Sequence, residues 1–160
     1  MNDNGTVAFN AGFTKGGAAI FESNDGNLTT IADTSSGSIF KNFNSDVALN
    51  QQGDVTFLAD LKDGSTAIYT KSATGFHKVI AVGDPLDDST VTSLFISHKG
   101  LNDHGQITFD AVLANGGEEV FRADPVPPPQ QSSVLSQSSI SSLGLVILCL
   151  VSYYRKRARN

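Results

Sequence analysis

Apolar and polar residues alternate with a period of two in three places along the chain. The stretches VAFNAGF, VTFLADL and ITFDAVL begin at Val7, Val55 and Ile107. Such alternation puts every second side chain on one face, as in a half-buried β-strand. Each stretch follows an Asn-x-x-Gly pattern and precedes a second turn that contains glycine. The sequence therefore predicts short strands joined by tight turns.

The three strands belong to an internal repeat of about fifty residues. The copies start near Met1, Leu49 and Leu101, and the first two share a second half, GNLTTIAD and GFHKVIAVGD. The repeat signature is an Asn and a Gly in the turn and a Phe in the strand, and we expect its role to be structural. The signature residues are Asn2, Gly5 and Phe9; Asn50, Gly53 and Phe57; and Asn102, Gly105 and Phe109.

A further apolar stretch, at 38–44 and again at 92–97, is expected to close each copy with a fourth strand. We therefore expect an all-β repeat region at 1–123, built from four-stranded antiparallel units at about 1–48 and 49–100 and a partial unit at 101–123. The expected arrangement is an incomplete β-propeller, with a stacked β-solenoid as the alternative. Because propellers close with about four to eight units, we expect either a longer protein of which this chain is the C-terminal part or a truncated gene model.

The composition changes at Asp124. Residues 124–139 form a linker rich in Pro, Ser and Gln, and residues 140–160 combine an apolar run with a basic end. This predicts a C-terminal apolar helix as a membrane or sorting segment, with the basic residues in the cytoplasm. The membrane segment consists of Leu143, Leu145, Val146, Ile147, Leu148, Leu150 and Val151. The basic stop consists of Arg155, Lys156, Arg157 and Arg159.

The charge distribution argues against nucleic acid as a partner. Up to Asp124 the chain holds seven basic and sixteen acidic residues, a net charge of −9, whereas phosphate backbones are bound by basic surfaces. His77, His98 and His104 lack the spacing of metal ligands. We therefore expect no catalytic residue, no metal site and no cofactor. The oxygen-rich turns NDNG, SNDGN and NDHG leave calcium as an alternative.

The stretch NDNGTVAF at 2–9 resembles the Asn-x-x-Gly-x-x-Ala-Phe pattern of a bacterial family of tandem-repeat envelope proteins, the choice-of-anchor proteins. The other copies, NQQGDVTF and NDHGQITF, carry Thr in place of Ala. The tail resembles a PEP-CTERM sorting signal, although proline replaces the glutamate of that pattern. The resemblance implies export, insertion by the tail and processing by an exosortase. The corresponding sorting motif is Val126, Pro127, Pro128 and Pro129.

These features predict a non-enzymatic protein of the cell envelope or the exopolysaccharide matrix, displayed by its C-terminal segment. The expected partner is the membrane, and the resemblance adds an exosortase and a polysaccharide. After processing, the exported body would be released into the extracellular matrix. The alternative is a propeller-type lectin or glycan-active enzyme, which a pocket lined by aromatic and acidic side chains would favour.

Overall fold

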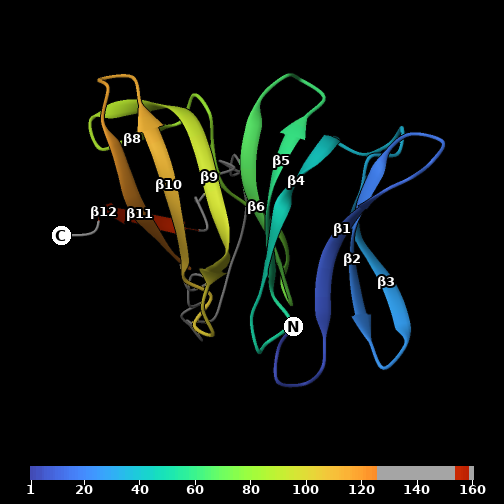
Figure 1. Cartoon of the computed structure of the whole chain (residues 1–160). Helices are drawn as coiled ribbons and strands as arrows, with labels where there is room; N and C mark the ends of the chain where they lie inside the picture. Colours follow the sequence, from blue (N-terminus) through green and yellow to red (C-terminus); the bar gives the residue numbers. More distant parts are fainter. Residues whose placement is uncertain (126–153, 159–160) are drawn as a thin grey trace, which may run out of the picture.

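The structure, a computed structural model, describes residues 1–125 and 154–158. It contains three antiparallel sheets, which Figure 1 shows side by side in chain order. The all-β prediction is confirmed, and within the described residues the sheets form no closed barrel, propeller or solenoid. No helix in this part of the chain is long and apolar enough to cross a membrane. The linker from 126, the sorting motif at 126–129, the apolar run at 143–151 and Arg159 lie outside the described residues.

The first sheet has three strands in the order β1-β2-β3. They are β1 (Val7–Gly12), β2 (Ala18–Asn24) and β3 (Asn27–Asp33). The chain reverses between β1 and β2 through Gly16 and Gly17, whose φ angles are 89° and 91°. Glycine adopts such angles without the steric cost that a Cβ would add. Among the described strands, β1 pairs with β2 alone, so its other edge is open.

The second sheet is a four-stranded meander in the order β4-β5-β6-β7. Its strands are β4 (Phe40–Leu49), β5 (Val55–Leu61), β6 (Thr66–Ser72) and β7 (Gly75–Ala81). The stretch at 38–44 was expected to close the first repeat copy, and this expectation is wrong. β4 pairs with β5 of the next copy, because Phe40 and Phe43 both pack against Phe57 at centroid distances of 5.6 and 5.5 Å.

The third sheet has the order β12-β11-β10-β9-β8. Its strands are β8 (Pro85–Leu86), β9 (Ser89–Leu101), β10 (Ile107–Leu113), β11 (Glu118–Pro125) and β12 (Tyr154–Ala158). The long strand β9 contains the stretch at 92–97 and pairs with β10, as β4 pairs with β5. The sequence assigned Tyr154 to the apolar segment and 155–158 to the basic end of the tail. The backbone of 154–158 forms a strand antiparallel to β11. Arg155, Lys156 and Arg157 therefore belong to the edge of this sheet.

The core consists of two apolar clusters on opposite faces of the second sheet. Ile20 of the first sheet packs with Phe57 on one face, and Leu58 packs with Phe109 of the third sheet on the other. Phe57 and Leu58 are neighbours in β5 and point to opposite faces because side chains alternate along a strand. The middle sheet is thus covered on both faces by its neighbours, as expected for stacked repeats.

Candidate functional site

The asparagine of each repeat signature organises its own turn. Its side-chain oxygen accepts hydrogen bonds from the backbone amides two and four residues later, at 3.1 and 3.0 Å for Asn2 and at 3.1 and 2.8 Å for Asn50. Asn102 does the same at 3.0 Å for both bonds. Gly5 and Gly53 complete two of the turns at φ angles of 78° and 81°. The turn chemistry predicted from the sequence is therefore present in all three copies.

The same asparagines also connect the sheets. Nδ2 of Asn2 donates to the carbonyl of Asn50 at 3.1 Å, and Nδ2 of Asn50 donates to the carbonyl of Asn102 at 3.1 Å. Neighbouring residues add bonds in the same direction, from the Asp3 amide to Oε1 of Gln51 and from the Gln51 amide to Oδ1 of Asp103. We call Asn2, Asn50 and Asn102 the asparagine ladder. The sequence gives the spacing of its members, but not this second bond.

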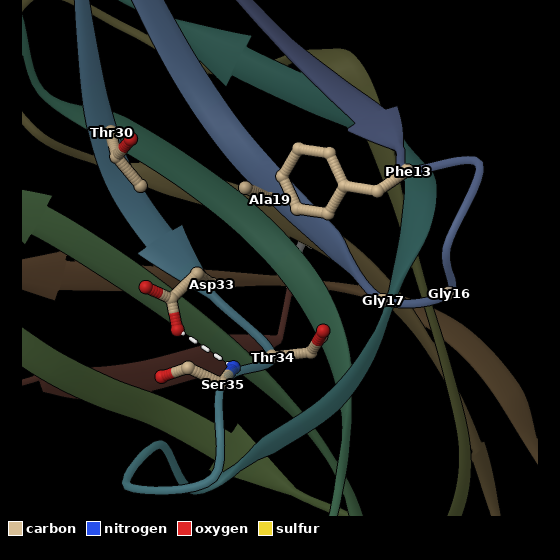
Figure 2. A pocket seen from close by; sticks show the side chains of 8 residues that line it. All are labelled: Phe13, Gly16, Gly17, Ala19, Thr30, Asp33, Thr34 and Ser35. Carbon is tan, nitrogen blue, oxygen red and sulfur yellow. Dashed lines mark hydrogen bonds between the residues drawn. The ribbon is translucent and has the colours of Figure 1, made fainter.

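One hollow lies at the end of the first sheet, where β1 turns into β2 and β3 ends. Its volume is about 340 Å³, and Figure 2 shows the Phe13 ring close to Ala19 on one side and Asp33 to Ser35 on the other. Gly17 is required here because an added Cβ would lie 2.9 Å from Oγ1 of Thr34. That hydroxyl oxygen accepts the Ala18 amide at 2.9 Å. The hollow is therefore a shallow, mostly apolar depression beside a polar loop.

The Asp33 carboxylate at this hollow accepts hydrogen bonds from its own loop. The hydroxyl and the amide of Ser35 donate hydrogen bonds that lower the pKa of Asp33 below its ordinary value. Ser65 holds the pKa of Asp63 below its ordinary value in the same way. Burial, together with the charge of Asp63, raises the pKa of Tyr69. Asp63 and Tyr69 line a further hollow of about 420 Å³ at the corresponding end of the second sheet.

A third hollow, of about 390 Å³, lies between the second and third sheets. We call it the β4–β9 hollow, because most of its lining comes from these two strands. Asn44 and Asp46 line it from β4, and Leu94 and Ile96 line it from β9. The exposed Phe95 side chain lies on the opposite face of β9, because Phe95 pairs with Asp110 while Leu94 and Ile96 point to the second sheet. Leu58 lies at its base and is buried. The hollow therefore joins polar groups of β4 to apolar side chains of β5 and β9.

The histidines singled out in the sequence lie on separate elements: His77 on β7, His98 on β9, and His104 in the turn before β10. Nε2 of His77 bonds Oγ1 of Thr74 at 2.9 Å. In the described part of the chain, no group of three His, Cys, Asp or Glu residues is placed to hold a metal ion. Neither the histidines nor the turn carboxylates therefore converge on one described site.

Comparison with protein families, curated proteins and solved structures gives no match. The site must therefore be interpreted from its own geometry. The repeat-signature residues lie in the turns and in the junctions between sheets. All three asparagines of the ladder were predicted from the sequence as signature residues. The β4–β9 hollow was not predicted, because its lining depends on how two strands about fifty residues apart approach each other.

Proposed function

We propose that this chain is a non-enzymatic repeat protein of the cell envelope or the exopolysaccharide matrix, displayed by its C-terminal segment. The observation that supports this proposal best is that the repeated residues hold one sheet to the next. Two members of the asparagine ladder donate across a junction, and Phe57 and Phe109 fill the two inter-sheet cores. Such residues build a rigid array whose surface is available for contacts with its surroundings.

We also propose that the three sheets are successive units of propeller type. The sheets follow one another in chain order, and β4 contacts both β1 of the preceding sheet and β9 of the following sheet. In this arrangement β4 and β9 are the inner strands of their units. Asp124 and Pro125, which the sequence assigned to the linker, belong to β11. The linker from 126 to 139 would hold the array away from the membrane, and the apolar run at 143–151 would fix its location. This assignment rests on the resemblance of the tail to a sorting signal.

Localisation of two separately tagged ends tests the display proposal. One tag is inserted in the exposed turn between β1 and β2, a second follows Asn160, and the chain is exported in a host that contains an exosortase. We expect the first tag outside the cell and the second tag separated from it or retained in the membrane. Both tags in the cytosol, after export of a control protein by the same leader, would contradict the proposal.

Comparing one variant with the unaltered chain separates processing from anchoring. Replacing Pro127 and Pro129 by Ala alters the sorting motif and leaves the apolar run intact. If an exosortase processes the chain, the two tags should stay joined in this variant alone. Two tags that stay joined in both proteins mean a plain membrane anchor, which keeps the display function and removes the exosortase as a partner.

A further inference from the structure

Both junctions between sheets use the same pair of surfaces. The sheet later in the chain contributes the face that carries the signature phenylalanine, Phe57 or Phe109. The earlier sheet contributes its opposite face, through Ile20 in the first junction and Ile68 in the second. We call these the signature face and the isoleucine face. Because the two surfaces differ, the junction is directional, and every sheet carries one surface of each kind.

The signature face of the first sheet has no neighbour among the described residues. Phe9 is 37% exposed, whereas its counterparts in the other two copies, Phe57 and Phe109, are 0% and 2% exposed. Val7 is 36% exposed, and its counterparts, Val55 and Ile107, are fully buried. The rings of Phe9 and Phe13 both contact the ring of Phe21, at centroid distances of 5.7 and 6.2 Å. This aromatic face therefore matches the buried ones in composition and differs from them in having no described neighbour.

Within the part of the chain that the structure describes, the isoleucine face of the third sheet has no neighbour either. Val120 stands in β11 where Ile20 stands in β2 and Ile68 stands in β6, since each pairs with the strand residue that follows the signature Phe. Ile20 and Ile68 are 0% exposed, whereas Val120 is 41% exposed. Asp110, which pairs with Val120, is the counterpart of Asn10, whose amide donates to the Asn44 carbonyl across the first junction. A polar side chain at the position of Asp110 is therefore compatible with a junction, because Asn10 occupies the same position in the first one.

The asparagine ladder is open at the same two ends. The Asn50 carbonyl accepts both the Gly53 amide and Nδ2 of Asn2, whereas the only described donor to the Asn2 carbonyl is the Gly5 amide. At the other end, Nδ2 of Asn102 donates to Oε1 of Gln106 within its own turn, at 2.7 Å. One end offers a carbonyl and the other end offers an amide, in the orientation that the two internal steps already use.

We propose that a second copy of this chain docks head to tail, with the isoleucine face of its third sheet on the signature face of the first sheet. The occupant follows from continuity with the two junctions inside the chain, because the exposed Val120 of this chain stands where Ile20 and Ile68 pack in the junctions that bury Phe57 and Phe109. The contact is heterologous, so each copy uses one end and leaves the other available. Nδ2 of Asn102 in one copy then donates to the carbonyl of Asn2 in the next.

Two charge substitutions block the two surfaces separately. Val7→Lys places an ammonium group on the signature face, and Val120→Lys places one on the isoleucine face. Both side chains are exposed in a single copy, so folding does not depend on their burial. Leu28→Lys is the matched control. Leu28 lies on the signature face of the first sheet, as Val7 does. Its counterpart in the second sheet, Phe76, stays exposed although the first sheet covers that face, so a lysine at 28 should leave docking intact.

Sedimentation velocity of the full chain over a hundredfold range of concentration is the measurement. A mild detergent, present in molar excess over the protein, keeps the apolar run at 143–151 from causing association. We expect the unaltered chain and Leu28→Lys to associate as concentration rises, and Val7→Lys and Val120→Lys to remain single at a concentration at least tenfold higher. The midpoint of thermal unfolding, measured on each dilute variant, should stay that of the unaltered chain.

Mixing the two blocked variants decides the direction of the contact. Val7→Lys retains its isoleucine face and Val120→Lys retains its signature face, so an equal mixture should form a one-to-one complex that grows no further. A chain that stays single at every concentration overturns the proposal. So does association that survives both substitutions, association that Leu28→Lys also abolishes, or a mixture that stays single while each variant is folded.

Discussion

At the scale of single residues, the asparagine that opens each repeat turn satisfies two requirements with one side chain. Its oxygen accepts two backbone amides of its own turn, and its nitrogen is free to donate elsewhere. Aspartate would serve the first requirement equally well, since its carboxylate also accepts such bonds. Only an amide supplies the donor that reaches the carbonyl of the next repeat in the chain. Asn therefore recurs at this position because the repeats bind one another.

Replacing Asn2 by Asp separates these two requirements. The variant keeps an oxygen for the amides of Asn4 and Thr6, but a carboxylate oxygen now faces the carbonyl of Asn50 in a buried position. The lost donor, and a carboxylate oxygen placed against a buried carbonyl oxygen, cost about 1–3 kcal/mol. We expect the free energy of unfolding, measured by urea denaturation, to fall by that amount.

The control for Asn2→Asp is Asn115→Asp. Asn115 also accepts an amide of its own turn, that of Gly117 at 3.0 Å, but it lies in an exposed hairpin. Aspartate retains this bond, and exposed substitutions usually change stability by less than about 0.5 kcal/mol. Equal losses in the two variants would mean that the turn, and not the ladder, accounts for the effect.

The titration of Asp63 gives a second prediction at this scale. The Ser65 hydroxyl and amide donate to Oδ1 of Asp63 at 2.7 and 2.9 Å and lower its pKa below the ordinary value of 3.8. These bonds favour the charged carboxylate, so their contribution to stability is present above pH 3.8 and is lost as the pH falls through the lowered pKa. In Ser65→Ala we expect the pKa of Asp63 to rise toward 3.8.

Carbon-13 NMR of the side-chain carboxyl groups measures this shift. Asp33 serves as the internal reference, because Ser35 lowers its pKa by the same arrangement and is unchanged in the variant. An Asp63 pKa that does not move in Ser65→Ala would show that the hydroxyl is not the main cause.

At the scale of secondary-structure elements, the irregular strand β9 depends on one glycine. Its pairing with β10 jumps from Leu101 opposite Ile107 to Ile96 opposite Phe109, so the residues between them bulge. A Cβ on Gly100 would lie 2.7 Å from the Thr108 carbonyl oxygen and 3.0 Å from that of Ser97. Both contacts are with backbone atoms, which cannot move without disturbing the pairing.

We therefore expect Gly100→Ala to lower the free energy of unfolding by about 1–3 kcal/mol, the usual cost of overpacking. The matched control is Gly37→Ala in the loop before β4, where an added Cβ meets no atom within 4 Å. The control should change stability by less than about 0.5 kcal/mol. Urea denaturation of both variants is sufficient, and a Gly100→Ala variant as stable as the control would contradict the role of the bulge.

The strands also show which parts of the fold could be predicted from the sequence. Period-two alternation after an Asn-x-x-Gly turn located β1, β5 and β10 correctly, because that signal is local. It could not assign β4, since Phe40 can pack toward either the preceding or the following strand until Phe57 is known to lie beneath it. The backbone pairing of β12 with β11 could not be predicted either, because the composition of β12 indicates a charged chain end.

At the scale of the whole molecule, the three sheets have unequal environments. The second sheet is covered on both faces, whereas the first is covered on the face of Ile20 and exposed on the face of Phe9. In a repeat array, stability is approximately a sum over the units and their interfaces, so a unit with one interface opens more readily than a unit with two. The open edge of β1 adds to this difference, since its amides have a described strand partner on one side only.

Hydrogen exchange measured by mass spectrometry resolves these units. In dilute protein we expect the slowest exchange in peptides from β5 and β6 and faster exchange in those from β1 and β2, because opening the first sheet breaks one interface and opening the second breaks two. Equal protection of all four strands would mean that the array opens as a single cooperative unit. If copies dock head to tail, raising the concentration should slow exchange in β1 and β2 and leave β5 and β6 unchanged, because only the first pair lies on a surface that a second copy covers.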